Sequence, residues 1–330
     1  MSNTPKIYTA TDPGAPQLTG QAGSLLAVLD AVLVNGYGAG VNAKAAAGWT
    51  IAFSAGNVRA YRNNPLTGTG TYLRVDDAGT VGSARVAHLR AGRNMTGLDT
   101  FDDPTPTVAQ QASGVTWAKS ATLDAVTRDW VIVATDTWFY FFACSANARW
   151  VRSEMVPNFA GDLDSPRPDD LYNFYLTVGC TSSYAGASGA TMSQALRTDG
   201  VATAARSAFG YVMRGVGLTS GAVEASLMNQ LGRDVTASAV ASDGFAYPYP
   251  LDGGLWMQRL LVISGALQPR GWMPCIYGPN HLRPLTDMAL EGALAGWPGR
   301  SFLVKSFWTN VHNSTVWNGQ VLFDITPEDG

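Results

Sequence analysis

Charged side chains are scarce in this sequence. Asp, Glu, Lys and Arg make up 14% of its 330 residues, against about 25% in an ordinary soluble domain. The basic residues are 18 Arg and only 4 Lys, and they form no basic run. Because nucleic-acid affinity depends mainly on clustered positive charge, we do not expect DNA or RNA as a partner. The low charge favours a protein whose surface is partly covered by other subunits.

Histidine is also scarce, which limits the chemistry that the chain could perform. The sequence contains no G-x-S-x-G nucleophile motif and no HExxH motif, and no two histidines have metal-ligand spacing. The three histidines are His88, His281 and His312. Since nucleophilic catalysis by serine or cysteine usually needs a histidine base, we interpret all three as structural or surface residues.

Cysteine pairs and long apolar runs are missing as well. Cys144, Cys180 and Cys275 are far apart and odd in number, which argues against a zinc site or a disulfide framework and predicts buried thiols in a reducing compartment. The first residues show no secretory signal. The most apolar stretch, 130–144, is interrupted by polar residues and is too short for a membrane helix. We therefore expect a protein that is made in the cytoplasm and not inserted into a membrane.

Carboxylates are the remaining candidates for chemistry. The densest cluster lies in a proline-containing stretch and consists of Asp162, Asp164, Asp169 and Asp170. Asp76–Asp77 and Asp102–Asp103 are smaller groups. The spacing matches no EF-hand, and prolines among acidic residues are typical of a stiff surface loop. We interpret the cluster as solvated turn residues, and we assign no catalytic, cofactor-binding or metal-binding residue.

A glycine-rich stretch at 36–40 could be mistaken for a phosphate-binding loop. Here the glycines follow a predicted helix and lead into a strand, whereas a phosphate loop needs the order strand, loop, helix. The ten tryptophans could form a sugar-binding platform, but most lie in apolar strand patterns that predict core positions. Neither feature predicts a cofactor.

One amphipathic helix is predicted near the start of the chain. Leu and Val recur at helical spacing between Leu25 and Leu33, Ser24 is the expected N-cap, and Asn35–Gly36 is the expected stop. We expect this helix to pack its apolar side on a sheet.

Most of the remaining chain has strand patterns. Apolar and β-branched residues alternate or cluster between turn signals. We expect strands over 49–53, 57–61, 71–76, 84–90, 115–123, 129–134, 137–144, 171–178, 255–263, 302–304 and 320–323. The strands at 130–133 and 138–142 are apolar on both faces, which predicts cover on each side.

The segment 180–252 differs from its surroundings, because small residues dominate it and patterning is weak except for a possible helix across Ala222–Leu231. A stretch of this length is uncommon unless it binds something. We therefore expect a mainly β fold, sandwich-like or barrel-like, in three parts: a helix and β core over 1–179, an irregular insertion over 180–252 that contacts other subunits, and strands over 253–330 that return to the core.

The N-terminal segments 7–20 and 23–38, together with 47–49, 53–57 and 72–77, resemble a group of uncharacterised virion-associated proteins of tailed bacteriophages. The pattern extends to Gly253–Trp256 and Gly271–Pro274, and 180–252 matches least. The resemblance implies a structural component of a phage particle, near the tail, the baseplate or the head–tail junction. It implies as partners other copies of the chain and other virion proteins, and it carries no catalytic residues to this sequence.

Three functions are therefore open. The first is a virion structural subunit, which holds its neighbours through its N-terminal segment and 180–252. The second is a tail-fibre-like module that binds host-surface glycans through exposed Trp and Tyr. The third, which the sequence favours least, is a carbohydrate-active enzyme that uses the acidic cluster, since glycosidases need a pair of facing carboxyl groups.

Overall fold

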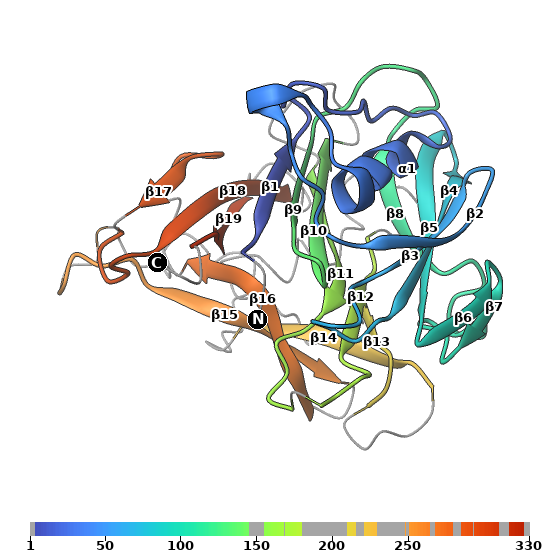
Figure 1. The fold of residues 1–330 in the computed structure, drawn as a ribbon. Helices are drawn as coiled ribbons and strands as arrows, with labels where there is room; N and C mark the ends of the chain where they lie inside the picture. Colours follow the sequence, from blue (N-terminus) through green and yellow to red (C-terminus); the bar gives the residue numbers. More distant parts are fainter. Residues whose placement is uncertain are drawn as a thin grey trace.

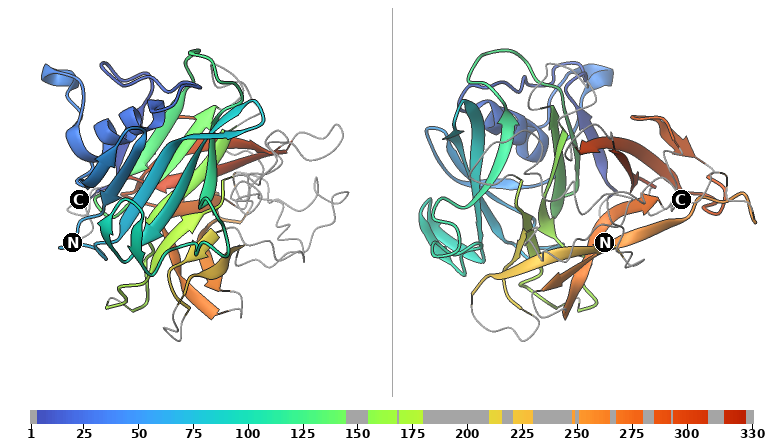
Figure 2. Two further views of the ribbon diagram at one scale, coloured as in Figure 1. Left: turned by 90° about the vertical axis from the view of Figure 1, so that its right-hand side faces the viewer. Right: turned by 180° about the vertical axis from the view of Figure 1, so that it is seen from behind.

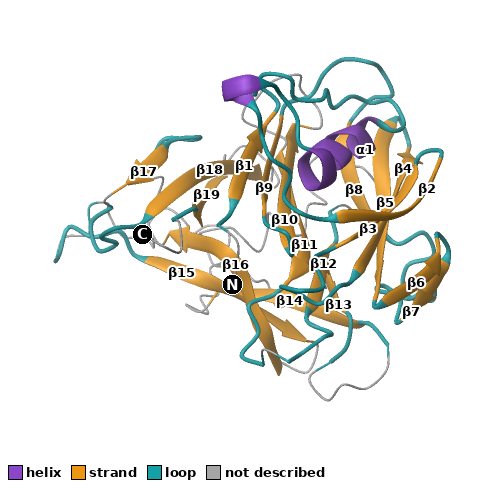
Figure 3. Cartoon of the chain, viewed as in Figure 1, coloured by secondary structure: helices purple, strands orange, loops and turns teal. Residues whose placement is uncertain are grey.

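The computed structural model describes residues 4–144, 155–167, 169–179, 210–215, 221–229, 248, 251–264, 268–279, 285–292, 294–309 and 317–326. Within these ranges the chain is mainly β, as the sequence predicts, with a short helical segment near its start (Figures 1 and 3). The helical elements are α1 (Ser24–Leu29), the π-helical turn η1 (Asp30–Asn35) and the 3-10 turn η2 (Gly40–Asn42). The strands are β1 (Lys6–Thr9), β2 (Thr50–Ala55), β3 (Val58–Arg62), β4 (Tyr72–Val81), β5 (Ala84–Gly92), β6 (Asn94–Gly97), β7 (Thr100–Asp102), β8 (Val115–Ser120), β9 (Trp130–Ala134), β10 (Trp138–Cys144), β11 (Met155–Asp162), β12 (Phe174–Thr177), β13 (Gly210–Val212), β14 (Val223–Asn229), β15 (Met257–Ser264), β16 (Gln268–Pro279), β17 (Leu290–Gly292), β18 (Ser301–Thr309) and β19 (Trp317–Asp324).

The predicted helix is present and ends where expected. The N–H of Gly36, a residue with φ 75°, donates to the carbonyl of Ala31 at 2.7 Å, which closes the π-helical turn. The predicted N-cap is wrong. Ser24 is the first helical residue, and its hydroxyl donates to the carbonyl of Thr19 at 2.9 Å while accepting a hydrogen bond from the Lys119 ammonium. The Ser24 hydroxyl therefore binds the Lys119 ammonium and does not cap the helix.

The first sheet contains five antiparallel strands in the order β2-β3-β4-β5-β8. The strands predicted at 49–53 and 57–61 correspond to β2 and β3, which pair as a hairpin across the turn at Gly56 and Asn57. The helical segment is fixed to this sheet by Asp30, which accepts a hydrogen bond from the Tyr61 hydroxyl at 2.6 Å and lies 3.4 Å from the Arg59 guanidinium. This sheet and α1 form one outer layer of the molecule.

The second sheet contains twelve strands in the order β1-β9-β10-β11-β12-β13-β14-β15-β16-β19-β18-β17, and all its pairs are antiparallel. It curls so that its two halves face each other. The ring of Phe323 in β19 lies 4.9 Å from that of Tyr140 and 5.6 Å from that of Phe142 in β10, although many strands separate β10 and β19 in the sheet. The space inside the curl is filled by a second apolar core.

The hairpin β9–β10 lies between these two cores. Phe139 and Phe141 point to the core shared with α1 and the five-stranded sheet, and Tyr140 and Phe142 point into the curl. Figure 2 shows β10–β12 in green between the blue and cyan sheet and the orange and red strands. All twelve residues of β9 and β10 are buried, so the prediction of central strands covered on each face is confirmed.

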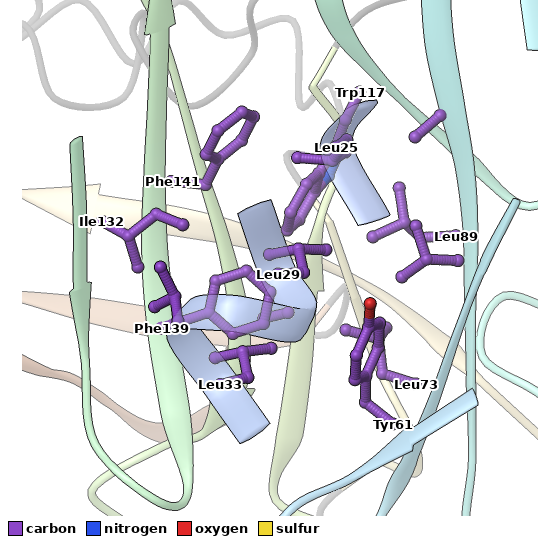
Figure 4. Close-up of a cluster of buried hydrophobic side chains, with 14 of the residues drawn as sticks. Leu25, Leu29, Leu33, Tyr61, Leu73, Leu89, Trp117, Ile132, Phe139 and Phe141 are labelled. Carbon is purple, nitrogen blue, oxygen red and sulfur yellow. The ribbon is translucent and has the colours of Figure 1, made fainter. Parts of the chain in front are cut away.

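The core beneath α1 is built from three elements. Figure 4 shows Leu25, Leu29 and Leu33 pointing between the side chains of the five-stranded sheet and those of β9 and β10. Trp117 lies at the meeting point, with its ring stacked on Phe141 at 6.2 Å. Its indole N–H donates to the carbonyl of Thr177 at 2.8 Å, which ties β8 to β12.

The predicted helix across Ala222–Leu231 is wrong, because Val223–Asn229 forms strand β14. Within 180–252, β13 and β14 continue the large sheet between β12 and β15. The other residues of this segment lie outside the described part of the chain, except for a few short stretches. No helix among the described residues is long and apolar enough to cross a membrane.

Candidate functional site

The densest polar site lies where the two large sheets meet. The loop 63–71, which joins β3 to β4, crosses the β9–β10 turn and the end of β11. The backbone N–H of Asn64 donates to the carbonyl of Asp136 at 2.9 Å, and the Asn63 side chain donates to the carbonyl of Thr137 at 3.2 Å. The loop therefore connects the five-stranded sheet to the central hairpin.

Asp162, the last residue of β11, is the centre of this site. Its Oδ2 accepts the backbone N–H of Thr69 and its Oδ1 accepts the Thr69 hydroxyl, both at 2.7 Å. The side chain is 8% exposed. Burial raises the pKa of Asp162 to about 6, and the hydrogen bonds from Thr69 and Asn63 and the charge of Arg93 act in the opposite direction.

Asp136 holds the same loop from the β9–β10 turn. Its Oδ2 accepts hydrogen bonds from the Thr67 hydroxyl at 2.6 Å and from the Asn64 amide at 2.8 Å. Gly68 lies beside the Asp162 carboxylate, and a Cβ built on it would overlap Asp162 Oδ2 and lie 2.6 Å from Thr137 Cγ2. Glycine is therefore needed here for the close approach of loop and strand.

A pocket of about 380 Å³ opens beside these carboxylates. Its wall includes Asp136, Asp162 and Asn173, and the Oδ1 atom of Asn173 is buried without a hydrogen-bond partner among the described residues. Two exposed leucines, Leu66 at 92% and Leu171 at 48%, also line it. The pocket thus combines hydrogen-bonding groups with apolar side chains that face solvent, a combination common in small-molecule sites.

The acidic cluster predicted as solvated is split by the structure. Asp164 and Asp169 are exposed, as expected. For Asp162 and Asp170 the prediction is wrong, because both are buried. Asp170 forms an ion pair with Arg270 of β16, and the exposed Asp164 pairs with Arg259 of β15.

A second buried polar group joins α1 to the five-stranded sheet. The carboxylate of Asp77 in β4 contacts the ammonium of Lys119 in β8, and neither side chain is exposed. Of the smaller acidic groups, Asp103 in turn pairs with Arg214 at 2.7 Å. Sequence reasoning missed Lys119, although a lone lysine inside an apolar strand is a signal of a buried ion pair.

The remaining candidates do not join the site. His88 is half-buried in β5, its Nδ1 lies 3.4 Å from the Thr116 hydroxyl oxygen, and burial lowers its pKa. His281, His312 and Cys180 lie outside the described residues. Cys144 is buried and Cys275 partly buried, and neither is in a disulfide. In the part of the chain that the structure describes, no three His, Cys, Asp or Glu side chains are close enough to hold a metal ion.

Most described tryptophans lie in the core, as predicted. Trp49, Trp117, Trp130 and Trp138 are fully or nearly fully buried, Trp272 and Trp297 are partly buried, and Trp256 is 45% exposed. The glycine-rich stretch 36–40 follows η1 and leads into η2, so it does not have the strand-then-helix order of a phosphate loop.

Chemically, the site offers one carboxyl group whose pKa burial raises to about 6, and a pocket of about 380 Å³ beside it. Its remaining carboxylates are held by Thr, Asn or Arg side chains of neighbouring elements. This arrangement joins layers and can accept hydrogen bonds from a polar ligand. In comparisons with known proteins, no family model and no curated sequence matches this chain.

Proposed function

We propose that this chain is a structural, non-enzymatic subunit of a tailed-bacteriophage virion. It would assemble in the host cytoplasm with copies of itself and with other virion proteins, in the tail, the baseplate or the head–tail junction. Two observations support the proposal. Several segments resemble virion-associated proteins, and two of those segments contact each other in the fold.

The observation that carries the proposal is that resembling segments from different parts of the sequence contact each other in the fold. Segments 7–20 and 23–38 contain most of β1 together with α1 and η1, and segment 72–77 is the first six of the ten residues of β4. Asp77, the last residue of the latter, accepts the N–H of Leu25 in α1 at 2.9 Å. Two of the segments that carry the resemblance are therefore joined to each other across the layers, as expected if the relatives share an architecture.

The use of charge supports the same role. Asp77–Lys119 and Asp170–Arg270 are buried pairs between different elements, so part of the small complement of charges is used inside the fold. What remains for the surface is poor in charge, and depletion of charge is a property of the centres of protein–protein interfaces.

The proposal is tested on particles made by the phage genome that encodes the chain. We expect the chain at constant stoichiometry in density-purified particles, with immunogold label at one fixed position. Detection only in the soluble fraction of the lysate would contradict the proposal. Deleting 183–245 is unsuitable as a test, because it removes β13 and β14 from the middle of the large sheet.

The pocket favours a second candidate, a module that binds host-surface glycans. The buried Oδ1 atom of Asn173 and the carboxylate of Asp162 are acceptors for sugar hydroxyl groups, and Leu66 offers an apolar contact. A glycan array with the purified chain tests this role. We expect specific binding that Asn173→Ala abolishes and that Asn94→Ala, at an exposed position in β6, leaves unchanged; no binding by the unchanged chain would exclude the role.

The third function is a carbohydrate-active enzyme, and the purified chain also serves to test it. An enzyme would clear polysaccharide from a host lawn, and Asp162→Asn would abolish the clearing. Retained clearing by Asp162→Asn, Asp164→Asn, Asp169→Asn and Asp170→Asn would exclude the acidic cluster as its catalytic group.

A further inference from the structure

The two large sheets end in four strands, and three of these ends are protected. Beside β1, the Lys44 ammonium donates to the carbonyl of Ile7 at 3.0 Å and the Tyr8 hydroxyl donates to the carbonyl of Ala45 at 2.8 Å. The segment around Lys44 therefore occupies the outer side of β1. A covered edge cannot pair with another chain.

The ends at β17 and β8 are protected in other ways. β17 has three residues and carries Glu291, and short, charged edge strands discourage pairing. β8 is buried except for Thr116, whose carbonyl already accepts the N–H of Gly179 at 3.1 Å. Neither strand presents a long ladder to a partner.

The fourth end, β2, has little of this protection. Its six residues are Thr50, Ile51, Ala52, Phe53, Ser54 and Ala55, with no charged residue and no proline. All but Phe53 are exposed, and no described strand pairs with its outer side (Figure 1). A bulge between Ile51 and Phe53 bends the strand, but the pairing with β3 is regular on both sides of it.

The hairpin geometry shows which backbone groups point outward. Ala55 and Val58 are the closing pair of the two-residue turn, and such a pair exchanges both of its hydrogen bonds across the hairpin. Because hydrogen-bonding direction alternates along an antiparallel strand, the N–H and C=O of Ser54 point away from β3. They are ready to pair with an added strand.

We infer that β2 pairs antiparallel with β2 of a second copy of this chain, across a two-fold axis, so that the two five-stranded sheets become continuous. The inference deepens the proposed function, on which it rests, by naming the partner and the surface. In such a pair β2 of one copy lies opposite β2 of the other, so any charged residue in the strand would lie near the same charge in the partner strand. The segment has none, and Thr, Ile and Phe are favourable in strands. This self-compatibility is the reason for choosing a second copy as the occupant.

The test compares variants of the full chain by sedimentation equilibrium across a dilution series. Ser54→Pro removes the outward N–H and leaves the β2–β3 bonds in place, because proline is tolerated on an edge whose N–H faces solvent. Ser54→Ala is the matched control that retains the N–H. Ala52→Lys adds a charge to the edge, and Thr80→Lys adds the same charge at an exposed position of β4, an internal strand.

We expect the unchanged chain, Ser54→Ala and Thr80→Lys to form dimers. We expect Ser54→Pro and Ala52→Lys to raise the dimer dissociation constant about tenfold or more. The two-fold symmetry places both changes in the interface twice, so the proline removes the outward N–H of Ser54 from both copies and the lysine adds two like charges. Hydrogen exchange provides a measurement without mutation: peptides that cover 50–55 should gain protection as the concentration rises.

A chain that is monomeric at every concentration would overturn the inference, and so would dimers that Ser54→Pro does not weaken and that leave 50–55 unprotected. Exchange on the unchanged chain decides the matter if Ser54→Pro does not fold. The result is separable from the proposed function, because a monomeric chain that still enters particles would refute the β2 pairing alone.

Discussion

The ammonium nitrogen of Lys119 lies 2.6 Å from Oδ2 of Asp77, and both side chains are fully buried. The same nitrogen donates to the carbonyl of Gln21 at 2.7 Å and to the Ser24 hydroxyl at 2.8 Å. Asp77 Oδ2 also accepts the N–H of Leu25. Burial lowers the pKa of Lys119 to about 8, and the negative charge of Asp77 opposes this effect. One ion pair thus fixes the start of α1 to both β4 and β8.

Replacing Lys119 by methionine should destabilise the protein strongly. The variant leaves the Asp77 carboxylate buried without its cation, and removing one partner of a buried pair costs about 3–5 kcal/mol. Urea denaturation followed by tryptophan fluorescence measures the loss. In the double variant Lys119→Met/Asp77→Asn the cost should be smaller than the sum of the two single costs, because the uncompensated charge is gone. Additive costs would show that the two groups do not act as a pair.

The stability of Asp162→Asn relative to the unchanged chain should depend on pH. Because the pKa of Asp162 is raised from 3.8 to about 6 in the fold, its protonated form is favoured there. Its contribution to stability is fully present below pH 3.8 and is lost as the pH rises through 6. The pKa difference corresponds to about 3 kcal/mol.

Denaturation of both proteins at several pH values between 4 and 7 tests this sign. Asparagine does not titrate, so the unfolding free energy of the unchanged chain should fall relative to that of the variant as the pH rises. The other titrating groups are common to both proteins and cancel in the difference. Parallel pH profiles would show that the Asp162 carboxyl has the same pKa in the folded and unfolded chain.

Gly68→Ala should separate the loop 63–71 from the end of β11. The added methyl group would overlap the Asp162 carboxylate and contact Thr137, and overpacking of this kind costs about 1–3 kcal/mol. Gly292→Ala in β17 is a matched control, since nothing lies within 4 Å of its Cβ position. We expect that control to change the unfolding free energy by less than about 0.5 kcal/mol. Equal effects of the two variants would mean that the loop adapts without cost.

Trp117→Ala should be among the most destabilising core substitutions. The side chain is fully buried and its ring packs on Phe139 and Phe141. Truncating a buried tryptophan costs about 3–5 kcal/mol. Leu66→Ala, at a position that is 92% exposed, should leave the denaturation midpoint nearly unchanged. A small loss of unfolding free energy in Trp117→Ala would show that packing at this junction between layers contributes little to stability.

Local patterns predicted the elements whose partners are adjacent in sequence. The repeat from Leu25 to Leu33 predicted the helical segment, and the apolar runs 130–133 and 138–142 predicted the central strands β9 and β10. The mainly β fold is confirmed. In these elements the periodicity of the side chains and the turn residues specify the same structure, so no distant contact is needed to recognise it.

Distant partners explain what the sequence could not predict. Val223–Asn229 contains Glu, Ala, Leu and Met, which favour helix, but its pairing with β13 and β15 makes it a strand. Asp162 and Asp170 resembled solvated loop residues because their partners, Thr69 and Arg270, are 93 and 100 residues away. Nothing near these carboxylates in the sequence indicates that they are buried, and the pocket beside them was missed for the same reason.

The two-sided burial of β10 has a consequence for synthesis of the chain. One face of the strand is covered by α1 and the five-stranded sheet, all of which precede it in the sequence. The other face, with Tyr140 and Phe142, is closed by Phe323 of the last strand. Phe159 of β11 contacts Tyr140 early, but the cover that Phe323 gives to Tyr140 and Phe142 is missing from a nascent chain until β19 follows. Interrupted translation products would be prone to aggregate through this incompletely covered aromatic surface.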